Sequence, residues 1–409
     1  MIRNRRRAVS IVFVVVCITI ASIRQHADTG TCGGQMITLP FGDVSSGNIF
    51  FCSIAEAFFS GLTNGTTATT YSPAAPVPRE QMAAFVTRTM DQSVKRSSRR
   101  AALNQYWTIQ GSNNLGLTTV GSTPFGVQSD GADLWVANWG SGTVSRVRAS
   151  DGKLLDTWTG ATSPERVLCA AGEVFLTGAT NPGSLYLIFP TQPGGAVITI
   201  TNALGAGSIG IAFDGQRVWT ANFGTGAPST GSVSIISFPS SLTTVTTGFT
   251  SPEGIVYDGT NIWVTDNVPG SIGKLHKLDS SGNILLSVEV GSTPFDPAFD
   301  GTNIWVPNLF SNTVTVVRAT GGLAGTVLAT LSGNGLNRPL AAAFDGERII
   351  VTNNDVSGLD EDSVSLWNAS DFTPIGTFSM GVGSNPIGAC SDGLNFWITL
   401  SGTSRLARF

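Results

Sequence analysis

From residue 125 onward, the chain repeats one pattern of apolar and polar positions seven times. A typical unit has a short apolar run, an Asp-Gly pair and an apolar strand that in five of the seven units contains tryptophan, as in Ser-Asp-Gly-Ala-Asp-Leu-Trp-Val-Ala-Asn at 129–138. The glycine supplies the positive φ that a tight hairpin needs. The aromatic and β-branched residues that follow favour a strand. Alternating segments such as 143–147 and 154–158 add a third and a fourth strand to the unit.

The spacing of these units predicts the fold. The repeat glycines stand at 131, 172, 215, 259, 301, 346 and 393, so they are 41, 43, 44, 42, 45 and 47 residues apart. A period of this length is typical of one four-stranded propeller blade. The second copy, at 172–177, is degenerate but fills the gap in the series. We therefore predict an all-β, seven-bladed β-propeller over residues 115–409.

The last unit is one strand short. After Phe396-Trp397-Ile398-Thr399 only residues 404–409 remain, which is enough for a third strand but not a fourth. Gly-Ser-Thr-Pro-Phe occurs at both 121–125 and 291–295, and the second copy directly follows the fourth strand of a blade. We therefore expect residues 115–120 to supply the missing strand. Closing the ring removes sheet edges that would otherwise promote aggregation.

Two residue types recur at fixed positions of the repeat. Five of the nine tryptophans stand four residues after the repeat glycine. We interpret them as a packing layer between blades, because stacked blades bury large aromatic side chains against each other. The second strand ends in an amide or a carboxylate at Asn138, Asn222, Asp266, Asn308 and Asn353. Turn chemistry explains these residues without a ligand.

The N-terminus has the form of an export signal. A basic start at 1–7 precedes an apolar run at 8–23, which at 16 residues is short for a membrane span. We assign 1–23 to a signal peptide, with an uncleaved N-terminal anchor as the alternative. We therefore expect the protein to be secreted and to remain at the cell surface or cell wall. The alternative is that residues 8–23 anchor it in the membrane.

Residues 24–92 form a second, helical region. Its motifs are Phe-x-Asp-Val at 41–44, an apolar helical pattern at 50–59, Gly-Leu-Thr-Asn-Gly at 61–65, Tyr-x-Pro at 71–73, and Val-x-Arg-Glu-Gln-Met-Ala at 77–83. In this order they resemble a single S-layer homology module. That resemblance implies binding of cell-wall polysaccharide, with Asp43 and Arg79 at the sugar site.

This region also departs from that family. The chain has one copy where the family usually has three, and Pro78 stands where the family usually has threonine. A folded spacer, with Arg79 as an ordinary first-turn residue, is the alternative. Residues 93–114, which hold Lys95, Arg96, Arg99 and Arg100, form the predicted linker.

The charge of the propeller argues against nucleic acid as a partner. Charged residues make up 12% of the chain, and from residue 115 onward 12 basic side chains face 22 acidic ones, a difference of −10. Affinity for nucleic acid is dominated by Lys and Arg contacts to phosphate. We therefore expect a protein, peptide or glycan ligand.

The propeller resembles streptogramin-lyase-like and related YVTN–NHL-type repeats. The resemblance is carried by Ser-Pro-Glu-Gly-Ile-Val-Tyr-Asp-Gly at 251–259 and the Trp-Val-Thr-Asp that follows. It implies the fold more than the activity. In the lyases, two histidines and a glutamate surround a magnesium ion. This chain has only His26 and His276, so that site cannot be assembled in the ring.

The other nucleophile and base candidates are few. We expect His276 to be an exposed strand residue and to form no Ser-His-Asp or Cys-His set. Cys169 and Cys390, each three residues before a repeat glycine, are expected to be buried thiols. Cys32 and Cys52 could form a disulfide in an exported protein.

The remaining candidate site lies at one mouth of the central channel. The residues that follow the strand-opening prolines should point there, and most of them are apolar: Phe125, Ile209, Phe295, Leu340 and Ile387. Glu165 and Glu253 occupy the same position, with Asp296 one residue further on. Their oxygens could hold a divalent cation such as Ca²⁺, and sugar-lactonase-type propellers use a similar carboxylate site. The acidic stretch 355–362 is a second candidate, for which a solvated insertion is the favoured interpretation.

We therefore predict an exported surface or wall-associated protein whose propeller binds or scaffolds, with no cofactor required. The rival hypothesis is a secreted enzyme of the lactonase or lyase type that works through the carboxylates at the channel mouth.

Overall fold

The computed structural model describes residues 28–32, 35–59, 63, 65–79, 82, 116–225, 230–238, 241–354 and 362–409. The predicted leader, 1–23, and the whole of the predicted linker, 93–114, lie outside these residues. Of the helices within them, none has the length and apolar character needed to cross a bilayer.

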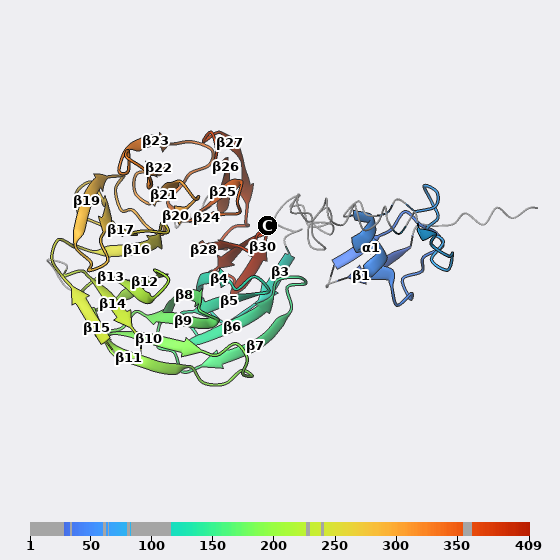
Figure 1. Ribbon diagram of the computed structural model, residues 1–409, viewed down its shortest axis with the longest axis horizontal. Coiled ribbons are helices and arrows are strands. Elements are labelled where there is room, and N and C mark those ends of the chain that lie inside the picture. Colours follow the sequence, from blue (N-terminus) through green and yellow to red (C-terminus); the bar gives the residue numbers. More distant parts are fainter. Residues whose placement is uncertain are drawn as a thin grey trace, which may run out of the picture.

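Residues 116–409 form seven four-stranded antiparallel sheets arranged around one axis (Figure 1). The innermost strands are β4 (Pro124–Ser129), β8 (Pro164–Ala170), β12 (Ser208–Phe213), β16 (Pro252–Tyr257), β20 (Ala298–Phe299), β24 (Pro339–Phe344) and β28 (Pro386–Ser391). The second strands are β5 (Asp133–Asn138), β9 (Glu173–Gly178), β13 (Arg217–Asn222), β17 (Ile262–Asp266), β21 (Asn303–Asn308), β25 (Arg348–Asn353) and β29 (Phe396–Leu400). The third strands are β6 (Thr143–Arg148), β10 (Gly183–Ile188), β14 (Ser232–Ser237), β18 (Lys274–Leu278), β22 (Thr313–Arg318), β26 (Ser363–Asn368) and β30 (Arg405–Arg408). The outer strands are β7 (Leu154–Thr159), β11 (Ile198–Leu204), β15 (Ser241–Val245), β19 (Ile284–Glu289), β23 (Val327–Leu331), β27 (Pro374–Ser379) and β3 (Gly116–Thr119). The predicted seven-bladed propeller is confirmed.

The seventh blade contains the two ends of the propeller segment. β3 pairs antiparallel with β30, and the register places Gly116 opposite Arg408 and Thr119 opposite Arg405. In Figure 1 the teal β3 accordingly lies beside the red β30. The backbone amide of Val120 also donates to the carbonyl of Ser404. The first and last strands of the propeller therefore share one sheet.

In five of the seven repeats, the Asp-Gly turn and the tryptophan form one hydrogen-bonded unit. Gly131 has φ of 96°, and the other repeat glycines are also positive. Asp130 uses one carboxylate oxygen to accept the backbone amides of Ala132 and Asp133, and the other to accept the indole Nε1–H of Trp135 at 2.8 Å. The same Asp–Trp bond recurs at Trp219, Trp263, Trp305 and Trp397. The turn therefore fixes the orientation of the indole that follows it.

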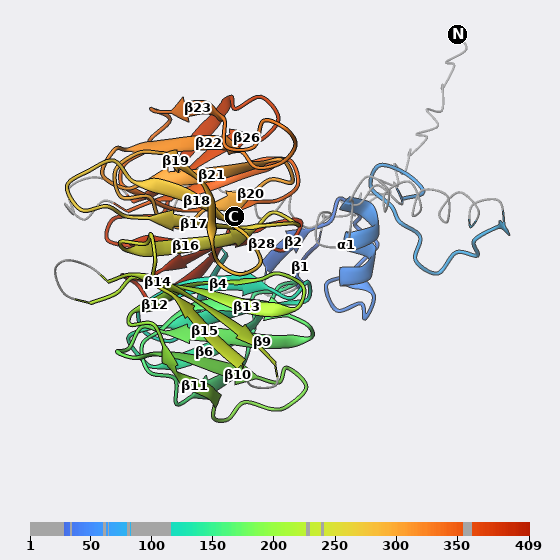
Figure 2. The same ribbon diagram turned by 60° about the vertical axis from the view of Figure 1, so that its left-hand side comes forward.

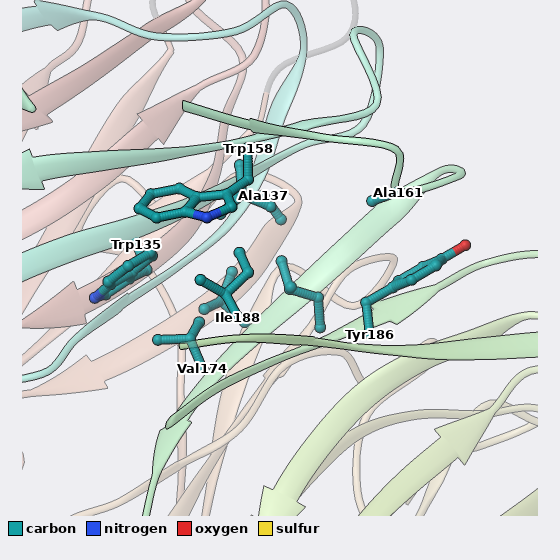
Figure 3. Packing of buried hydrophobic residues seen from close by; sticks show 10 residues of the cluster. Trp135, Ala137, Trp158, Ala161, Val174, Tyr186 and Ile188 are labelled. Carbon is teal, nitrogen blue, oxygen red and sulfur yellow. The ribbon is translucent and has the colours of Figure 1, made fainter. Parts of the chain in front are cut away.

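The tryptophans lie between blades, as predicted. All five are fully buried. In Figure 3, Trp135 of β5 and Trp158 of β7 pack against Val174 and Ile188 of the next blade, with Tyr186 beside them. Full burial of such side chains contributes a few kcal/mol each. A positively charged side chain covers several of the rings, as Arg146 covers Trp135 at 5.2 Å.

The residues that end the second strands are buried pins rather than turn residues. Asn222 donates from Nδ2 to Ser232 and Ser234 on the third strand and accepts a bond from Ser208 on the first. Equivalent bonds from the amide to third-strand hydroxyls occur at Asn138, Asn308 and Asn353. These side chains are at most 1% exposed. The prediction that turn chemistry alone explains them was therefore incomplete, since each one links strands of its own blade.

The N-terminal region is a small unit with its own core (Figure 2). It has a hairpin, β1 (Thr29–Cys32) and β2 (Gln35–Thr38), and the helix α1 (Phe51–Phe59). A disulfide joins Cys32 to Cys52, which links the hairpin to the helix. Phe41 is fully buried in this core. The helix was expected but the hairpin was not, and most of the second predicted helix, 77–88, lies outside the described residues.

Candidate functional site

A β-bulge interrupts the start of the inner strand in six of the seven blades. In six blades the pairing between the first and second strands shifts in register directly after the first residue of the inner strand, as between Pro124 and Val127. In the fifth blade the regular inner strand is reduced to β20, and Asp296 instead pairs in parallel with Ala341 of the next blade. Bulges commonly re-aim side chains in this way. The side chains of the two residues after the opening proline therefore do not follow the usual alternation between the two faces of the sheet.

Buried threonines connect these bulges from blade to blade. Thr265 of β17 accepts the amide of Gly254 in its own blade and donates to the carbonyl of Phe295 in the next. Thr177, Thr352 and Thr399 make the corresponding donated bonds to Ile209, Ile387 and Phe125. The last of these crosses from the seventh blade to the first. These bonds hold neighbouring inner strands together near their first residues, next to the positions of Arg166 and Asp296.

The second residue after the proline is small in five of the seven blades: Gly126, Gly210, Gly254, Ala341 and Gly388. A Cβ added to Gly126 would lie 2.6 Å from the carbonyl oxygen of Glu165 in the next blade, so there is no room for a side chain. The two blades that carry a long polar residue here have Arg166 and Asp296. Sequence reasoning selected Asp296 but missed Arg166.

Arg166 and Asp296 meet across the channel. Nε of Arg166 donates to Oδ2 of Asp296 at 3.1 Å, and its Nη1 lies 3.7 Å from Oε2 of Glu165. The residues come from the second and fifth blades. Arg166 is 8% exposed, Glu165 9% and Glu253 5%, whereas the Asp296 side chain is 26% exposed. Two buried atoms, Nη1 of Arg166 and Oε2 of Glu253, have no hydrogen-bond partner.

Burial and mutual repulsion change the protonation of this cluster. Burial raises the pKa of Glu253 to about 8; Arg166 opposes this rise, and Glu165, Asp296 and Asp266 add to it. Burial also raises the pKa of Glu165, against the attraction of Arg166. Burial would lower the pKa of Arg166, but Asp296, Glu165 and Glu253 raise it overall. At neutral pH the cluster thus holds a charged guanidinium and a protonated Glu253.

A cavity of about 420 Å³ runs along the inner strands from this ion pair. Arg166, Asp296, Gly126 and Gly388 line one end. At the other end lie residues that close their strands before the Asp-Gly turns, among them Gln128 and Tyr257. The volume is within the usual range for small-molecule sites. Because inner strands have an unpaired edge, backbone groups of these strands also face the axis.

The three predicted carboxylates have different roles in this geometry. Asp296 lines the cavity, whereas Glu165 and Glu253 lie behind Arg166 and are buried. Among the residues that the structure describes, no three His, Cys, Asp or Glu side chains are arranged to hold a metal ion. The positive charge among these carboxyl groups is instead the guanidinium of Arg166.

The structure contradicts the expectation for His276. This residue is buried, 2% exposed, and it does belong to a Ser-His-Asp array. Nδ1 bonds to Ser287 at 2.8 Å and Nε2 to Asp266 at 3.3 Å, and Asp266 also accepts the amides of Thr250 and Ser251. The prediction was wrong because it considered only the strand of His276, and cross-strand pairing supplies both partners. The array stands where other blades have the Asn–Ser/Thr pins, so it is the pin of this blade.

The two free cysteines of the described residues, Cys169 and Cys390, also border the cavity. Cys390 is buried and Cys169 is half-buried. Burial raises the pKa of both thiols above the ordinary range, so the thiolate forms are disfavoured. The backbone amide of Cys169 donates to Oε1 of Gln128 at 2.6 Å. The side-chain NH₂ group of Gln128 can therefore donate to another partner.

The N-terminal candidates lie in separate surroundings. Both carboxylate oxygens of Asp43 accept backbone amides, from Tyr71 at 2.8 Å and Ser72 at 2.7 Å, which ties the Tyr-x-Pro segment to the Phe-x-Asp-Val segment. Arg79 is exposed. Of the acidic stretch 355–362, only Asp362 is described. It is buried and accepts the amide of Asn385, so it anchors a loop.

Comparisons with known proteins indicate the fold alone. No protein-family model and no curated protein sequence matches the chain. Among solved structures, hydrazine synthase of Kuenenia stuttgartiensis is similar, with a TM-score of 0.58 at 17% identity, over 71% of this chain and 96% of that one. A streptogramin B lyase is similar with a TM-score of 0.55 at 14% identity, over 71% and 96%. The WD40 propeller domain of Doa1 gives 0.55 at 12% identity, over 72% and 95%. These three proteins share the propeller with this chain.

Proposed function

We propose that this propeller is a binding module and that its ligand enters the central channel from the end formed by the Asp-Gly turns. The observation that carries the proposal is the cavity of about 420 Å³ that ends on the Arg166–Asp296 pair. A cavity of this size with a few convergent polar groups is the usual form of a ligand site. The other recurring polar and aromatic residues of the repeat have structural roles, because the tryptophans, the Asn pins and the bridging threonines all have partners within the fold.

The polar groups that face the cavity favour a polar ligand. Gln128 and Tyr257 stand at the turn end, and Asp296 stands at the inner end. Edge strands offer backbone donors and acceptors between them. Peptides and glycans carry amides or hydroxyls that match such a wall, in agreement with the ligand classes expected from the sequence.

A blocked cavity tests the proposal. Purified protein is screened by ligand-observed NMR against N-acetyl amino-acid amides and monosaccharides at millimolar concentration. Ala389 lines the cavity and also packs against the core between the sixth and seventh blades, so the melting temperature of Ala389→Phe is checked first. Thr330→Phe adds the same ring to an exposed outer strand as a control. We expect at least one probe class to bind wild type and the control variant but not Ala389→Phe. No binding by any probe, or binding that Ala389→Phe leaves unchanged, contradicts the proposal.

A hydrolytic or lyase activity is the second candidate, favoured by one observation. Glu253, with a pKa of about 8, titrates near neutral pH, as a general acid or base must. The test is a panel of lactones and cyclic esters assayed with wild type and with the triple variant Glu165→Gln, Glu253→Gln, Asp296→Asn. Turnover that disappears in the triple variant would favour the enzyme over the binding module. A stoichiometric divalent metal in the purified protein would point the same way.

We also propose that the N-terminal unit holds the protein at the cell wall, as its resemblance to S-layer homology modules implies. Support comes from the disulfide Cys32–Cys52, which suits an exported protein, and from exposed Arg79. Residues 24–92 should sediment with purified cell wall, and Arg79→Ala should reduce the sedimented fraction. Equal recovery of both proteins in the supernatant would reduce the unit to a spacer.

A further inference from the structure

We infer that the channel takes a ligand that ends in an ammonium or guanidinium group, with Asp296 as its counter-ion. This inference rests on the proposed binding function and names the chemical class of the ligand. It follows from which polar atoms of the ion pair the cavity exposes.

Both members of the ion pair line the cavity, but the acceptor is more exposed than the donor. The Asp296 side chain is 26% exposed, against 10% for Arg166. The unpartnered Nη1 of Arg166 is buried on the side of Glu165, away from solvent. Arg166 already binds one Asp296 oxygen, Oδ2, and the other oxygen makes no hydrogen bond among the interactions of the described residues. A ligand in the cavity therefore meets a carboxylate oxygen, which selects for hydrogen-bond donors and positive charge.

The charge around the pair acts in the same direction. One guanidinium faces three carboxyl groups, those of Glu165, Glu253 and Asp296. Oε2 of Glu253 is buried without a hydrogen-bond partner, and Glu253 adds its negative charge to this end of the channel only as pH rises toward 8. With 12 basic and 22 acidic residues from 115 onward, the ring as a whole favours cations. A ligand carboxylate would meet the negative charge of Asp296 directly beside Arg166, which disfavours its binding.

The length of the cavity suits a side chain that enters end-on. Two residues of inner strand separate the level of Asp296 from that of Gln128, and three separate it from that of Tyr257, which is about 7 to 10 Å at roughly 3.3 Å per residue. An extended lysine or arginine side chain spans much of this distance. Tyr257 also lines a second space of about 180 Å³ between the third and fourth blades, beside Asp214 and Asp279. The main chain of a peptide ligand would lie at this mouth.

Four probes test the inference on the purified full chain. Nα-acetyl-lysine methylamide and its norleucine analogue differ only by the terminal ammonium group, the 2-aminoadipate analogue ends a side chain of similar length in a carboxylate and is called the glutamate probe below, and n-pentylamine supplies a free amine. Binding is measured by calorimetry or ligand-observed NMR. We expect the lysine probe to bind at least tenfold more tightly than the norleucine probe, and the glutamate probe not to bind. Comparable binding of n-pentylamine would identify a free amine as sufficient, while much weaker binding would identify a peptide side chain.

Variants separate a specific counter-ion from general attraction. Asp296→Asn keeps the shape and removes the charge, and it should weaken the lysine probe at least tenfold. Glu289→Gln removes an exposed acid on β19 and should leave binding unchanged. Because Asp296→Asn also removes a partner of Arg166, its melting temperature is measured first.

A pH series on wild type gives a second readout that needs no variant. Glu253 faces Arg166, Glu165, Asp296 and Asp266, and it gains a negative charge as pH rises through its pKa of about 8. Affinity for the lysine probe should therefore rise by about tenfold between about pH 6 and pH 9, while affinity for the norleucine probe stays flat.

The outcomes are distinguishable. Equal binding of the lysine and norleucine probes, or binding of the glutamate probe, overturns the ligand class and leaves the binding function intact. If none of these probes binds but the broader screen finds a ligand that Ala389→Phe blocks, the inference also fails alone. If nothing binds in either experiment, both fail.

Discussion

Arg166 decides what the carboxyl groups of the channel can do. Glu165, Glu253 and Asp296 would be candidate ligands for a hard cation if they stood alone, because Ca²⁺ prefers carboxylate oxygens. Instead, a buried guanidinium bonds to Asp296 and lies close to Glu165. A divalent ion in their midst would be repelled by Arg166. An ammonium at the exposed side of Asp296 is further from that charge, which is why the ligand that we infer is monovalent and organic.

Glu253 makes the free energy of unfolding depend on pH. Its pKa is about 8 in the folded protein against an ordinary value of 4.5, because burial disfavours the charged form. A raised carboxyl pKa contributes stability that is fully present below the unfolded pKa and is lost as pH rises toward the folded pKa. Wild type should therefore lose up to about 1.4 kcal/mol per pH unit between about pH 4.5 and pH 8 from this group alone.

Glu253→Gln, which mimics the protonated acid, should remove this loss. The measurement is urea unfolding of wild type and variant at a series of pH values, and the stability of the variant relative to wild type should grow with pH and level off above about pH 8. Glu289→Gln, at an exposed position, serves as the control and should follow wild type throughout. A constant difference between Glu253→Gln and wild type would mean that folding does not raise the pKa of Glu253.

At the scale of elements, the threonine bridges hold neighbouring inner strands together. Thr399 of β29 is fully buried, accepts the amide of Gly388 at 2.8 Å and donates to the carbonyl of Phe125 at 2.7 Å. Thr399→Val keeps the shape but leaves both backbone groups without this partner. Each buried group that loses its bond costs about 1–3 kcal/mol, so we expect a total loss of about 2–4 kcal/mol in unfolding free energy.

The matched control is Thr243→Val on the exposed face of β15, for which a change within about 0.5 kcal/mol is expected. The stability of both variants is measured by chemical denaturation, and their m-values should equal that of wild type. A Thr399→Val protein as stable as wild type would show that the bridge between the seventh and first blades adds nothing to the free energy of folding.

The repeat pattern predicted the elements well, because each strand is marked locally. Asp-Gly pairs and tryptophans recur at a fixed spacing, and they proved to be one hydrogen-bonded unit. The bulge at the start of the inner strand has no such mark. Without it, the residue after the proline was taken as the channel-facing one, and Arg166, one place further, was overlooked. Its contrast with Gly126, Gly210, Gly254 and Gly388 at the same repeat position was the available signal.

Partners on other strands were equally invisible in the sequence. Ser287 and Asp266 flank His276 only after β17, β18 and β19 pair, and no short motif connects the three residues. Likewise, the bond between Arg166 and Asp296 spans 130 residues and three blades. Periodicity predicts which residues share a position in the repeat, but side-chain contacts across the axis depend on the closed ring.

At the scale of the whole molecule, closure of the ring depends on four residues from its N-terminal end. β3 covers the edge of β30 through the pairs Gly116–Arg408 to Thr119–Arg405, and Thr118 donates to the carbonyl of Gly152 in the first blade. The seventh blade therefore joins the start of the propeller to its end. It also contains Thr399, which bonds to Phe125 of the first blade. Without β3, the edge of β30 would be open to pairing with another molecule.

Deletion of residues 111–120 should therefore leave a protein that aggregates or loses its cooperative thermal transition, whereas deletion of residues 101–110, which removes the same length of chain, should do neither. Light scattering and calorimetry at several protein concentrations measure both effects, since association through an open edge grows with concentration. A peptide of residues 111–120 added in trans should partly restore the transition, because it can occupy the same edge. A protein lacking 111–120 that stays monomeric and melts like the full chain would mean that packing between the first and seventh blades closes the ring without β3.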